Sequence, residues 1–211
     1  MHGWIEPFFE RAEAAIEPGQ IWCAQPVDLP VTHGLKIGKV DPKDDSKLGF
    51  EVVDHGDDAF GHAPIHSLGL RSDEAIMLAR ATRIRPAIVL GTTTTSQLLG
   101  SDRDGDGAAV IVVPLHTAER YDEPTRRRVA NYGFANAFYL PASRRPRLQE
   151  SIARLDHVQP VHRADLTEHR GLRLSGDALD ALVEWFVAYT TNRLLEDSLI
   201  LEYRRQQLAG D

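Results

Sequence analysis

Short apolar runs, separated by glycine, proline and polar residues, recur along the chain and predict a protein built mainly of β-strands. Residues 84–90 and 108–115 are rich in β-branched side chains and are too short for free-standing helices. Residues 20–27 and 151–160 have the same strand-like character. Several short strands followed by a helical end favour a small β-barrel with a helix packed on it.

Apolar residues at helical spacing occur near both ends of the sequence. In residues 4–16 they stand three, four or one positions apart, which predicts a short amphipathic helix within an N-terminal extension, residues 1–17. Ser175 is a suitable N-cap for a C-terminal helical region, residues 175–209, whose apolar side chains form one stripe. A break in that helix is expected at "YTTN", residues 189–192.

The stretch between the first and second predicted strands differs from the rest of the chain. Residues 34–72 are polar, contain several glycines and prolines, and have only short apolar pieces, which predicts an insertion. The 211 residues, 42% of them hydrophobic, are enough to bury one core, and no clean linker divides the sequence. We therefore expect a single domain, residues 1–211, with a surface insertion.

Cysteine content and hydropathy bear on the cellular compartment. No apolar run approaches the roughly 20 residues of a membrane helix, and the first residues are acidic and amphipathic rather than signal-like. Cys23 is the single cysteine, so an internal disulfide is excluded, and its apolar neighbours predict a small core residue. These features predict a cytoplasmic protein without a membrane partner.

The distribution of charge favours a nucleic-acid partner more than the net charge of -7 does. Residues 120–147 contain seven arginines and two acidic residues, interleaved with tyrosines and phenylalanines. Such a mixture can pair with phosphates and stack on unpaired bases, as a surface for single-stranded nucleic acid does. Alternatively, the aromatic residues belong to the core and the arginines to a solvated loop. The arginines are Arg120, Arg126, Arg127, Arg128, Arg144, Arg145 and Arg147.

Two acidic or histidine-rich stretches contain residue types that bind metal ions. "DRDGDG", residues 102–107, resembles the first half of a calcium loop, but Val113 stands where the bidentate glutamate belongs, which favours a polar hairpin. A second group has metal-ligand residue types without a firm motif; it consists of His55, Asp57, Asp58, His62 and His66. We expect no metal and no cofactor, although the sequence leaves open whether His55, His62 and His66 bind one.

Residues 151–160, "SIARLDHVQP", place two opposite charges among apolar neighbours. In a strand with a period of two, Arg154 and Asp156 point to one side, and His157 points to the other. One interpretation is an exposed salt bridge that contributes little to stability. The other is a catalytic pair, in which the carboxylate takes a proton and the guanidinium stabilises a phosphate.

Five segments, in this order, resemble the PemK/MazF toxin ribonucleases, and the resemblance covers about two thirds of the chain. They are "GQIW" (19–22), "RPAIVLG" (85–91), "VIVVPLHT" (110–117), "RLDHVQPV" (154–161) and "RLSGDALDAL" (173–182). The resemblance implies an SH3-like barrel with a terminal helix, a homodimer, and cleavage of single-stranded RNA without a metal. It also implies an antitoxin protein partner that fills the RNA groove.

The resemblance implies roles for particular residues. Arg154 and Asp156 match the Arg-x-Asp that members use as acid and base, and Arg85 matches an arginine at the scissile phosphate. His33 falls near the position of a further active-site histidine. The Glu-Gln pair that commonly precedes the "RP" dipeptide is absent here.

A further departure concerns the residues after "VPL". The family has Thr-Ser or Thr-Thr there, whereas this chain has His116 and Thr117, which would supply an extra proton donor or mark a site that has changed. Because arginine holds its proton, Arg154 is expected to stabilise charge, and His33 or His116 to donate the proton.

The expected chemistry is attack by the RNA 2′-hydroxyl, giving a 2′,3′-cyclic phosphate and a free 5′-hydroxyl, with Asp156 or a histidine as the base. The main alternative is a non-catalytic module that binds nucleic acid or a protein. A CcdB-type, gyrase-directed relative is a third possibility, against which the Arg-x-Asp motif speaks.

Overall fold

The computed structural model divides the chain into two compact units. One consists of Met1–Pro26 and Arg83–Asp211, and the other of Val27–Thr82. The structure describes residues 5–26, 33–41, 44–54, 76–78, 83–93, 109–144, 147–194 and 197–209. The sequence predicts one domain with an insertion at 34–72. In the structure that region belongs to a compact unit of its own, which has the wider bounds Val27–Thr82.

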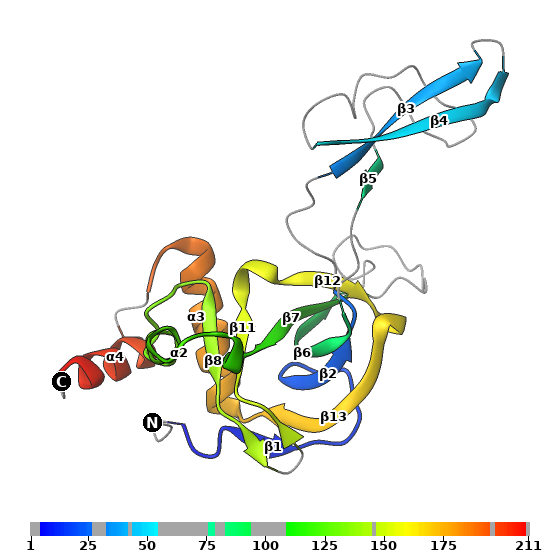
Figure 1. Cartoon of the computed structure of the whole chain (residues 1–211). Coiled ribbons are helices and arrows are strands. Elements are labelled where there is room, and N and C mark those ends of the chain that lie inside the picture. The colour runs from blue at the N-terminus through cyan, green and yellow to red at the C-terminus, as the bar shows by residue number, and fades with distance from the viewer. Residues whose placement is uncertain are drawn as a thin grey trace. The chain divides into compact units, whose positions relative to one another are not determined.

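The larger unit is built on an antiparallel sheet (Figure 1). The strand order is β1-β13-β2-β6-β7-β11-β8, and β12 pairs with β7 beside this path. The strands are β1 (Phe9–Arg11), β2 (Gln20–Ala24), β6 (Arg85–Thr93), β7 (Ala109–Thr117), β8 (Ala137–Leu140), β11 (Ser151–Arg154), β12 (Gln159–His162) and β13 (Leu166–Leu174). Two short strands, β9 (Ser143–Arg144) and β10 (Arg147–Leu148), pair only with each other among the described residues.

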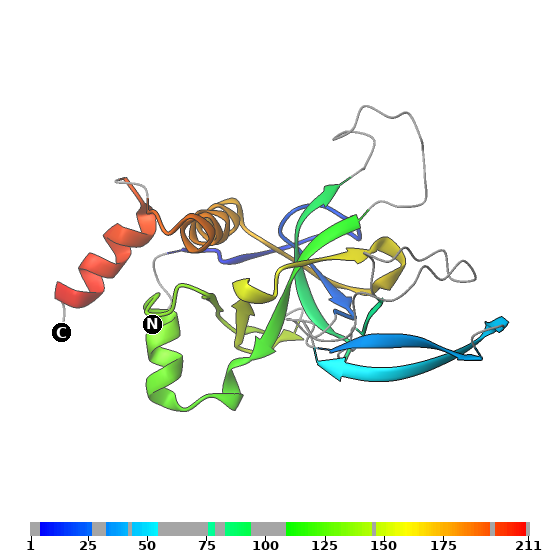
Figure 2. The same cartoon turned by 90° about the horizontal axis from the view of Figure 1, so that it is seen from above.

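Helices gather on one side of the larger unit, as Figures 1 and 2 show together. They are α2 (Glu123–Ala130), α3 (Gly176–Thr191) and α4 (Leu199–Ala209). Short 3-10 turns connect other elements: η2 (Ala118–Arg120) precedes α2, η3 (Leu155–His157) follows β11, and η4 (Arg163–Asp165) follows β12. The mainly β architecture with a C-terminal helix is confirmed. None of the described helices is long and apolar enough to cross a membrane.

The C-terminal helical region begins and breaks where the sequence predicts. The Oγ of Ser175 accepts a hydrogen bond from the backbone N of Ala178 at 3.3 Å, which is the predicted N-cap. Helix α3 ends at Thr191, and Asn192 follows with φ 54°, a left-handed conformation that ends helices. The break predicted in "YTTN" is therefore confirmed.

The core lies between the sheet and α3, and its strands are the predicted apolar runs. On β6 and β7, Ile88 and Val113 pack into the cluster that α3 covers, whereas Val89 and Val112 pack into a second cluster on the opposite face. Burial on both faces explains why these runs are continuously apolar rather than alternating. Cys23 on β2 is 8% exposed, so its predicted place in the core is confirmed.

The predicted N-terminal helix over residues 4–16 is wrong. Residues 5–8 form bends, and β1 pairs with β13, with Phe9 opposite Leu174. The carbonyl of Phe8 accepts a hydrogen bond from the backbone N of Ser175 at 3.0 Å, and both phenylalanines pack against the main core. The apolar spacing therefore reflects tertiary packing of an edge strand, which outweighs a local helical pattern that already contains Pro7.

The prediction of one continuous strand over 151–160 is also wrong. Strand β11 ends at Arg154, η3 turns the chain, and β12 begins at Gln159. The turn places the side chain of Leu155 in the core at 2% exposure, and the backbone N of Leu155 donates to the carbonyl of Asn136 at 2.9 Å. Because of this turn, β11 pairs with the C-terminal half of β7 and β12 with its N-terminal half.

The smaller unit has a sheet of its own. Its described strands are β3 (His33–Asp41), β4 (Asp44–Asp54) and β5 (Ile76–Leu78), in the antiparallel order β4-β3-β5. Ile37 is buried, but Phe50 and Val52 on β4 are more than half exposed. The histidine group (His55, His62, His66) and "DRDGDG" (102–107) lie outside the described residues.

Candidate active site

The neighbouring strands β6 and β7 bring Arg85 and His116 together. Ala87 pairs with Pro114, so two residues further along the antiparallel ladder Arg85 lies beside His116. Nη1 of Arg85 lies 3.0 Å from Nδ1 of His116 and 3.3 Å from Nε2. A guanidinium can only donate, so the nearer ring nitrogen, Nδ1, accepts and the imidazole proton belongs on Nε2.

The surroundings of His116 favour its uncharged form. Burial, and then the positive charge of Arg85, lower the pKa of His116 from 6.5 to about 4, and His157 and Arg154 act in the same direction. The imidazole is therefore neutral near pH 7. This changes the role expected for His116, because a neutral ring can donate a hydrogen bond from Nε2–H but is not an imidazolium acid.

Arg154 and Asp156 form a bidentate ion pair at the start of η3. Nε of Arg154 donates to Oδ1 of Asp156 at 2.8 Å, and Nη2 donates to Oδ2. The two side chains are 28% and 25% exposed, so solvent screens the pair only in part. The pair predicted from the motif thus exists, but it spans a turn instead of one strand face.

The pair also fixes the protonation of its members. Burial alone would raise the pKa of Asp156, but the hydrogen bonds and charge of Arg154 outweigh burial and hold this pKa below its usual value. The hydrogen bond from Arg154 to Asp156 raises the pKa of the guanidinium. Asp156 is therefore a carboxylate at neutral pH, and Arg154 is a poor proton donor.

His157 joins the two pairs and was missed by the sequence analysis. Its ring meets that of His116 edge to face, with centroids 5.8 Å apart, and its Nε2 lies 3.9 Å from Oδ2 of Asp156. A period of two assigned His157 to the opposite side from Asp156, but successive residues of a 3-10 turn do not alternate as in a strand. The sequence feature that could have identified His157 as a site residue is its position directly after the Arg-x-Asp motif.

Two further side chains support the ion pair from neighbouring segments. Tyr121, directly after η2, acts to raise the pKa of Arg154, and Asn136, directly before β8, acts to lower the pKa of Asp156, so both side chains favour the charged forms of the pair. The carbonyl of Asn136 also holds the backbone of Leu155 in place. Two segments of the larger unit, besides the pair's own, therefore surround it.

One other predicted site residue, Thr117, does not join this cluster. Thr117 is the strand partner of Ser151, and its side chain lies on the sheet face opposite to that of His116. There it lines a hollow that does not include the cluster residues. His33 begins β3 in the smaller unit, and its side chain lies outside the described part of the chain. The structure thus brings together Arg85, His116, Arg154 and Asp156, and it adds His157.

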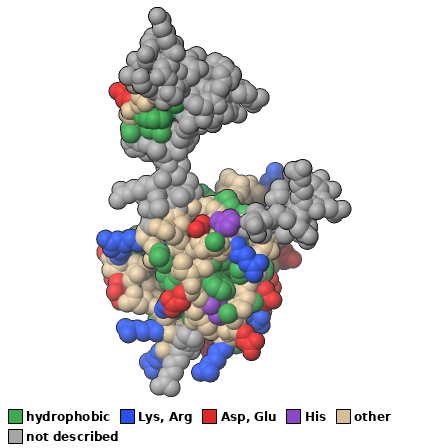
Figure 3. All heavy atoms as spheres, turned by 90° about the vertical axis from the view of Figure 1, so that its right-hand side faces the viewer, with side chains coloured by type: hydrophobic (Ala, Val, Ile, Leu, Met, Phe, Trp, Pro, Cys, Tyr) green, Lys and Arg blue, Asp and Glu red, His purple; other side chains and the backbone are tan. Residues whose placement is uncertain are grey.

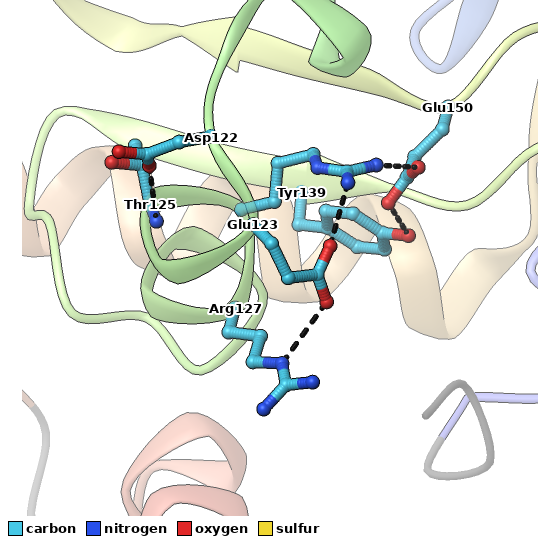
Figure 4. Close-up of polar contacts among 7 residues, drawn as sticks. Asp122, Glu123, Thr125, Arg127, Tyr139 and Glu150 are labelled. Carbon is cyan, nitrogen blue, oxygen red and sulfur yellow. Dashed lines mark hydrogen bonds and ion pairs between the residues drawn. The ribbon is translucent and has the colours of Figure 1, made fainter.

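The arginines of α2, predicted to bind RNA, are largely engaged within the protein (Figure 4). Nη2 of Arg126 lies 2.6 Å from Oε2 of Glu123, and Nη1 lies 3.6 Å from Oε2 of Glu150. Nε of Arg127 lies 3.0 Å from Oε1 of Glu123. Glu150 also accepts a hydrogen bond from the hydroxyl of Tyr139 at 2.6 Å, which ties the network to β8.

The remaining predicted RNA-binding residues are dispersed. Arg128 stacks over the ring of Phe134 at 4.6 Å from its centroid, Arg120 and Arg144 are exposed, and Arg145 lies outside the described residues. In the view of Figure 3, basic and acidic side chains of the described residues are interspersed. Exposed positive charge is consequently smaller than the composition of residues 120–147 indicates.

No protein-family model matches the chain, and neither a curated protein nor a solved structure does. The candidate site is therefore interpreted from its own chemistry. It contains two guanidinium groups, one carboxylate and two imidazoles. Together these groups can bind a phosphate, accept a proton and donate one. Within the described ranges, His, Cys, Asp and Glu side chains form no group of three that would hold a metal ion.

Proposed function

We propose that the chain is an endoribonuclease that cleaves single-stranded RNA without a metal, as the PemK/MazF toxins that it resembles do. One observation supports this most strongly. His157 stands between the Arg85–His116 pair and the Arg154–Asp156 pair, so groups from β6, β7 and η3 form one cluster. Each group in the cluster matches a need of RNA cleavage.

In the proposed reaction RNA supplies its own nucleophile. The 2′-oxygen attacks the adjacent phosphorus, its proton passes to the carboxylate of Asp156, and the bond from phosphorus to the 5′-oxygen breaks. His157 gives a proton to the leaving 5′-oxygen. The products are a 2′,3′-cyclic phosphate and a free 5′-hydroxyl, and a proton returned from Asp156 to His157 through solvent completes the cycle.

The other groups stabilise charge in this proposal. Arg154 and Arg85 neutralise negative charge that develops on the phosphate oxygens, which suits guanidinium groups that keep their protons. Neutral His116 donates a hydrogen bond from Nε2–H to a phosphate oxygen, since Arg85 occupies its other nitrogen. A neutral imidazole held in this way avoids the cost of placing one more cation beside the two arginines and the protonated His157.

The proposal includes the fold and assembly that the resemblance implies. A large antiparallel sheet with β12 paired to β7, and a helix after its last strand, supports an SH3-like barrel. Strands β1 and β8 end the sheet order and offer edges that a second copy can cover, which supports a homodimer. The proposed protein partner is an antitoxin that occupies the RNA-binding surface.

A second candidate function is a non-catalytic module that binds nucleic acid or a protein. The observation that favours it is the engagement of both Asp156 oxygens by Arg154, which makes the carboxylate a weak base. RNA cleavage requires the phosphate to draw the guanidinium partly away from Asp156. A binding module requires no such change.

One assay separates the two functions. Purified protein is incubated with mixed single-stranded RNA in EDTA, and the new ends are mapped chemically. Cleavage with 2′,3′-cyclic phosphate and 5′-hydroxyl ends supports the nuclease, whereas RNA that is bound but intact supports the binding module. An RNA with 2′-deoxy sugars is the matched control, because it keeps every phosphate but lacks the nucleophile.

A further inference from the structure

A polar hollow lies on the sheet face opposite to His116. The register pairs Thr117 with Ser151 and His116 with Ile152, so Thr117 and Ser151 point away from the proposed reaction centre. With Pro86 on β6, they line a hollow of about 220 Å³. Thr117, the residue after His116 on β7, lines the hollow, which therefore lies on the other side of the sheet from the His116 side chain.

The charge of this hollow is positive. Arg147 and Arg170 line it, and its described lining residues include no carboxylate. Nη1 of Arg170 lies 3.0 Å from Oε1 of Glu168, and Nη2 donates to the carbonyl of Arg147 at 3.2 Å, so its guanidinium is held in place. Arg147 forms no ion pair with a residue that the structure describes. One positive charge is therefore available for an anion.

The size and lining of the hollow limit the ligand. Binding sites for drug-sized molecules measure about 300–1,000 Å³, so this hollow accepts a smaller group. Its polar groups include the hydroxyl of Thr117 and the amide of Gln149, while Pro86 and the buried Leu115 provide apolar surface. Hydrogen-bond donors beside a small apolar surface suit a tetrahedral anion, such as a phosphate, that is attached to a sugar.

We propose that this hollow binds a phosphate group of single-stranded RNA other than the phosphate that is cleaved. Guanidinium groups and a hydroxyl match phosphate oxygens, and Pro86 and Leu115 would contact the attached ribose. The choice of RNA as the ligand rests on the proposed function, but binding itself needs no cleavage. The hollow would hold the RNA in register on the sheet.

The experiment uses the full chain labelled with ¹⁵N and follows arginine side-chain signals by NMR. The probes are AMP, adenosine and a 2′-O-methyl single-stranded RNA that cannot be cleaved. We expect AMP and the RNA to shift the Arg147 and Arg170 signals. Adenosine, which lacks the phosphate, should bind at least about tenfold more weakly than AMP. Arg147→Gln and Arg170→Gln should each weaken AMP binding about tenfold. Arg173→Gln is the matched control, because Arg173 lies on the same strand but pairs with Glu10 outside the hollow.

Equal binding of AMP and adenosine, or AMP binding that neither Arg147→Gln nor Arg170→Gln weakens, would overturn the assignment. If AMP shifts the two signals and the RNA does not, the ligand is a free nucleotide and the RNA assignment is wrong. Arg147 is exposed, so Arg147→Gln keeps the test valid even if Arg170→Gln fails to fold. Binding without any cleavage would contradict only the nuclease proposal.

Discussion

Nη1 of Arg85 lies 3.0 Å from Nδ1 of His116, so a cation and an imidazole share a partly buried position on adjacent strands. This contact, together with burial, keeps the imidazole neutral, since a second positive charge there would be repelled. The arrangement links the protonation of His116 to the stability of the fold. It also determines which groups of the site can transfer protons.

The free energy of unfolding should fall as the pH is lowered from 6.5 to about 4. In this range the unfolded chain binds a proton at His116 and the folded chain does not, because the folded pKa is about 4. Allowing for partial exposure, the loss is about 2 kcal/mol. Urea unfolding at pH 7 and pH 4.5 measures it. In the His116→Gln variant, whose amide oxygen still accepts from Arg85, this part of the pH dependence should vanish; an unchanged dependence would contradict the assignment.

Asp156→Asn should abolish cleavage while leaving the fold nearly intact. The substitution removes the proton acceptor but keeps the volume and one acceptor oxygen for Arg154. Arg154→Ala should slow cleavage about a hundredfold or more through lost charge stabilisation. Initial rates on a defined RNA, with thermal unfolding of each variant, check both. Cleavage by Asp156→Asn at the native rate would reduce the pair to a structural salt bridge.

His157→Gln should lower the cleavage rate about a hundredfold, because the imidazole that remains in the cluster, His116, is neutral near pH 7 and is not an acid for the leaving oxygen. Its matched control is His162→Gln, since His162 is exposed on β12, outside the cluster, and its ring nitrogen caps η4. A leaving group with a low pKa, such as a nitrophenyl ester at the 5′ side, should restore much of the lost rate. Absence of that rescue would argue that His157 has only a structural role.

Gly133→Ala should destabilise the larger unit by about 1–3 kcal/mol. A Cβ at this position would lie 2.5 Å from Cγ and 2.8 Å from the carbonyl oxygen of Arg128, at the end of α2. Gly176→Ala is the control, because a Cβ there meets nothing within 4 Å and the residue begins α3. Thermal unfolding should show a loss for the first variant and no loss for the second; equal stabilities would contradict the crowding at Gly133.

Replacing residues 27–82 by Asn-Gly should leave the larger unit folded. Ala24 pairs with Arg85, so Pro26 and Arg83 stand where a two-residue hairpin turn can join them. Cooperative unfolding of the shortened chain, near the temperature of the intact one, would support this prediction. Its RNA cleavage also tests His33, which the deletion removes: retained activity would exclude an essential role for that histidine.

The features that the sequence predicts correctly are those with local causes. The strands β2, β6 and β7 are apolar runs bounded by turn residues, and Ser175 caps α3 through its own side chain. The edge strand β1 is different, because its partner lies in β13 at the far end of the chain. No local pattern distinguishes such a strand from a short amphipathic helix.

The same distinction applies to the candidate site. Arg154 and Asp156 could be found from a motif two residues apart, but the turn that bends them together, and brings in His157, depends on burying Leu155. The contact of Arg85 with His116 depends on strand register. The composition of residues 120–147 indicates more exposed positive charge on α2 than the structure has, because Glu150, which pairs with Arg126, lies outside that stretch.

The indole of Trp185 has a consequence for spectroscopy. This side chain of α3 is 4% exposed, and its Nε1 donates to the carbonyl of Ala137 at 3.0 Å. Ala137 in turn is the strand partner of Arg154. Trp185 is one of three tryptophans in the chain. In a variant with Trp4 and Trp22 replaced by phenylalanine, its emission would report, without any added label, on a sheet edge that is one hydrogen bond and one strand pairing away from the ion pair.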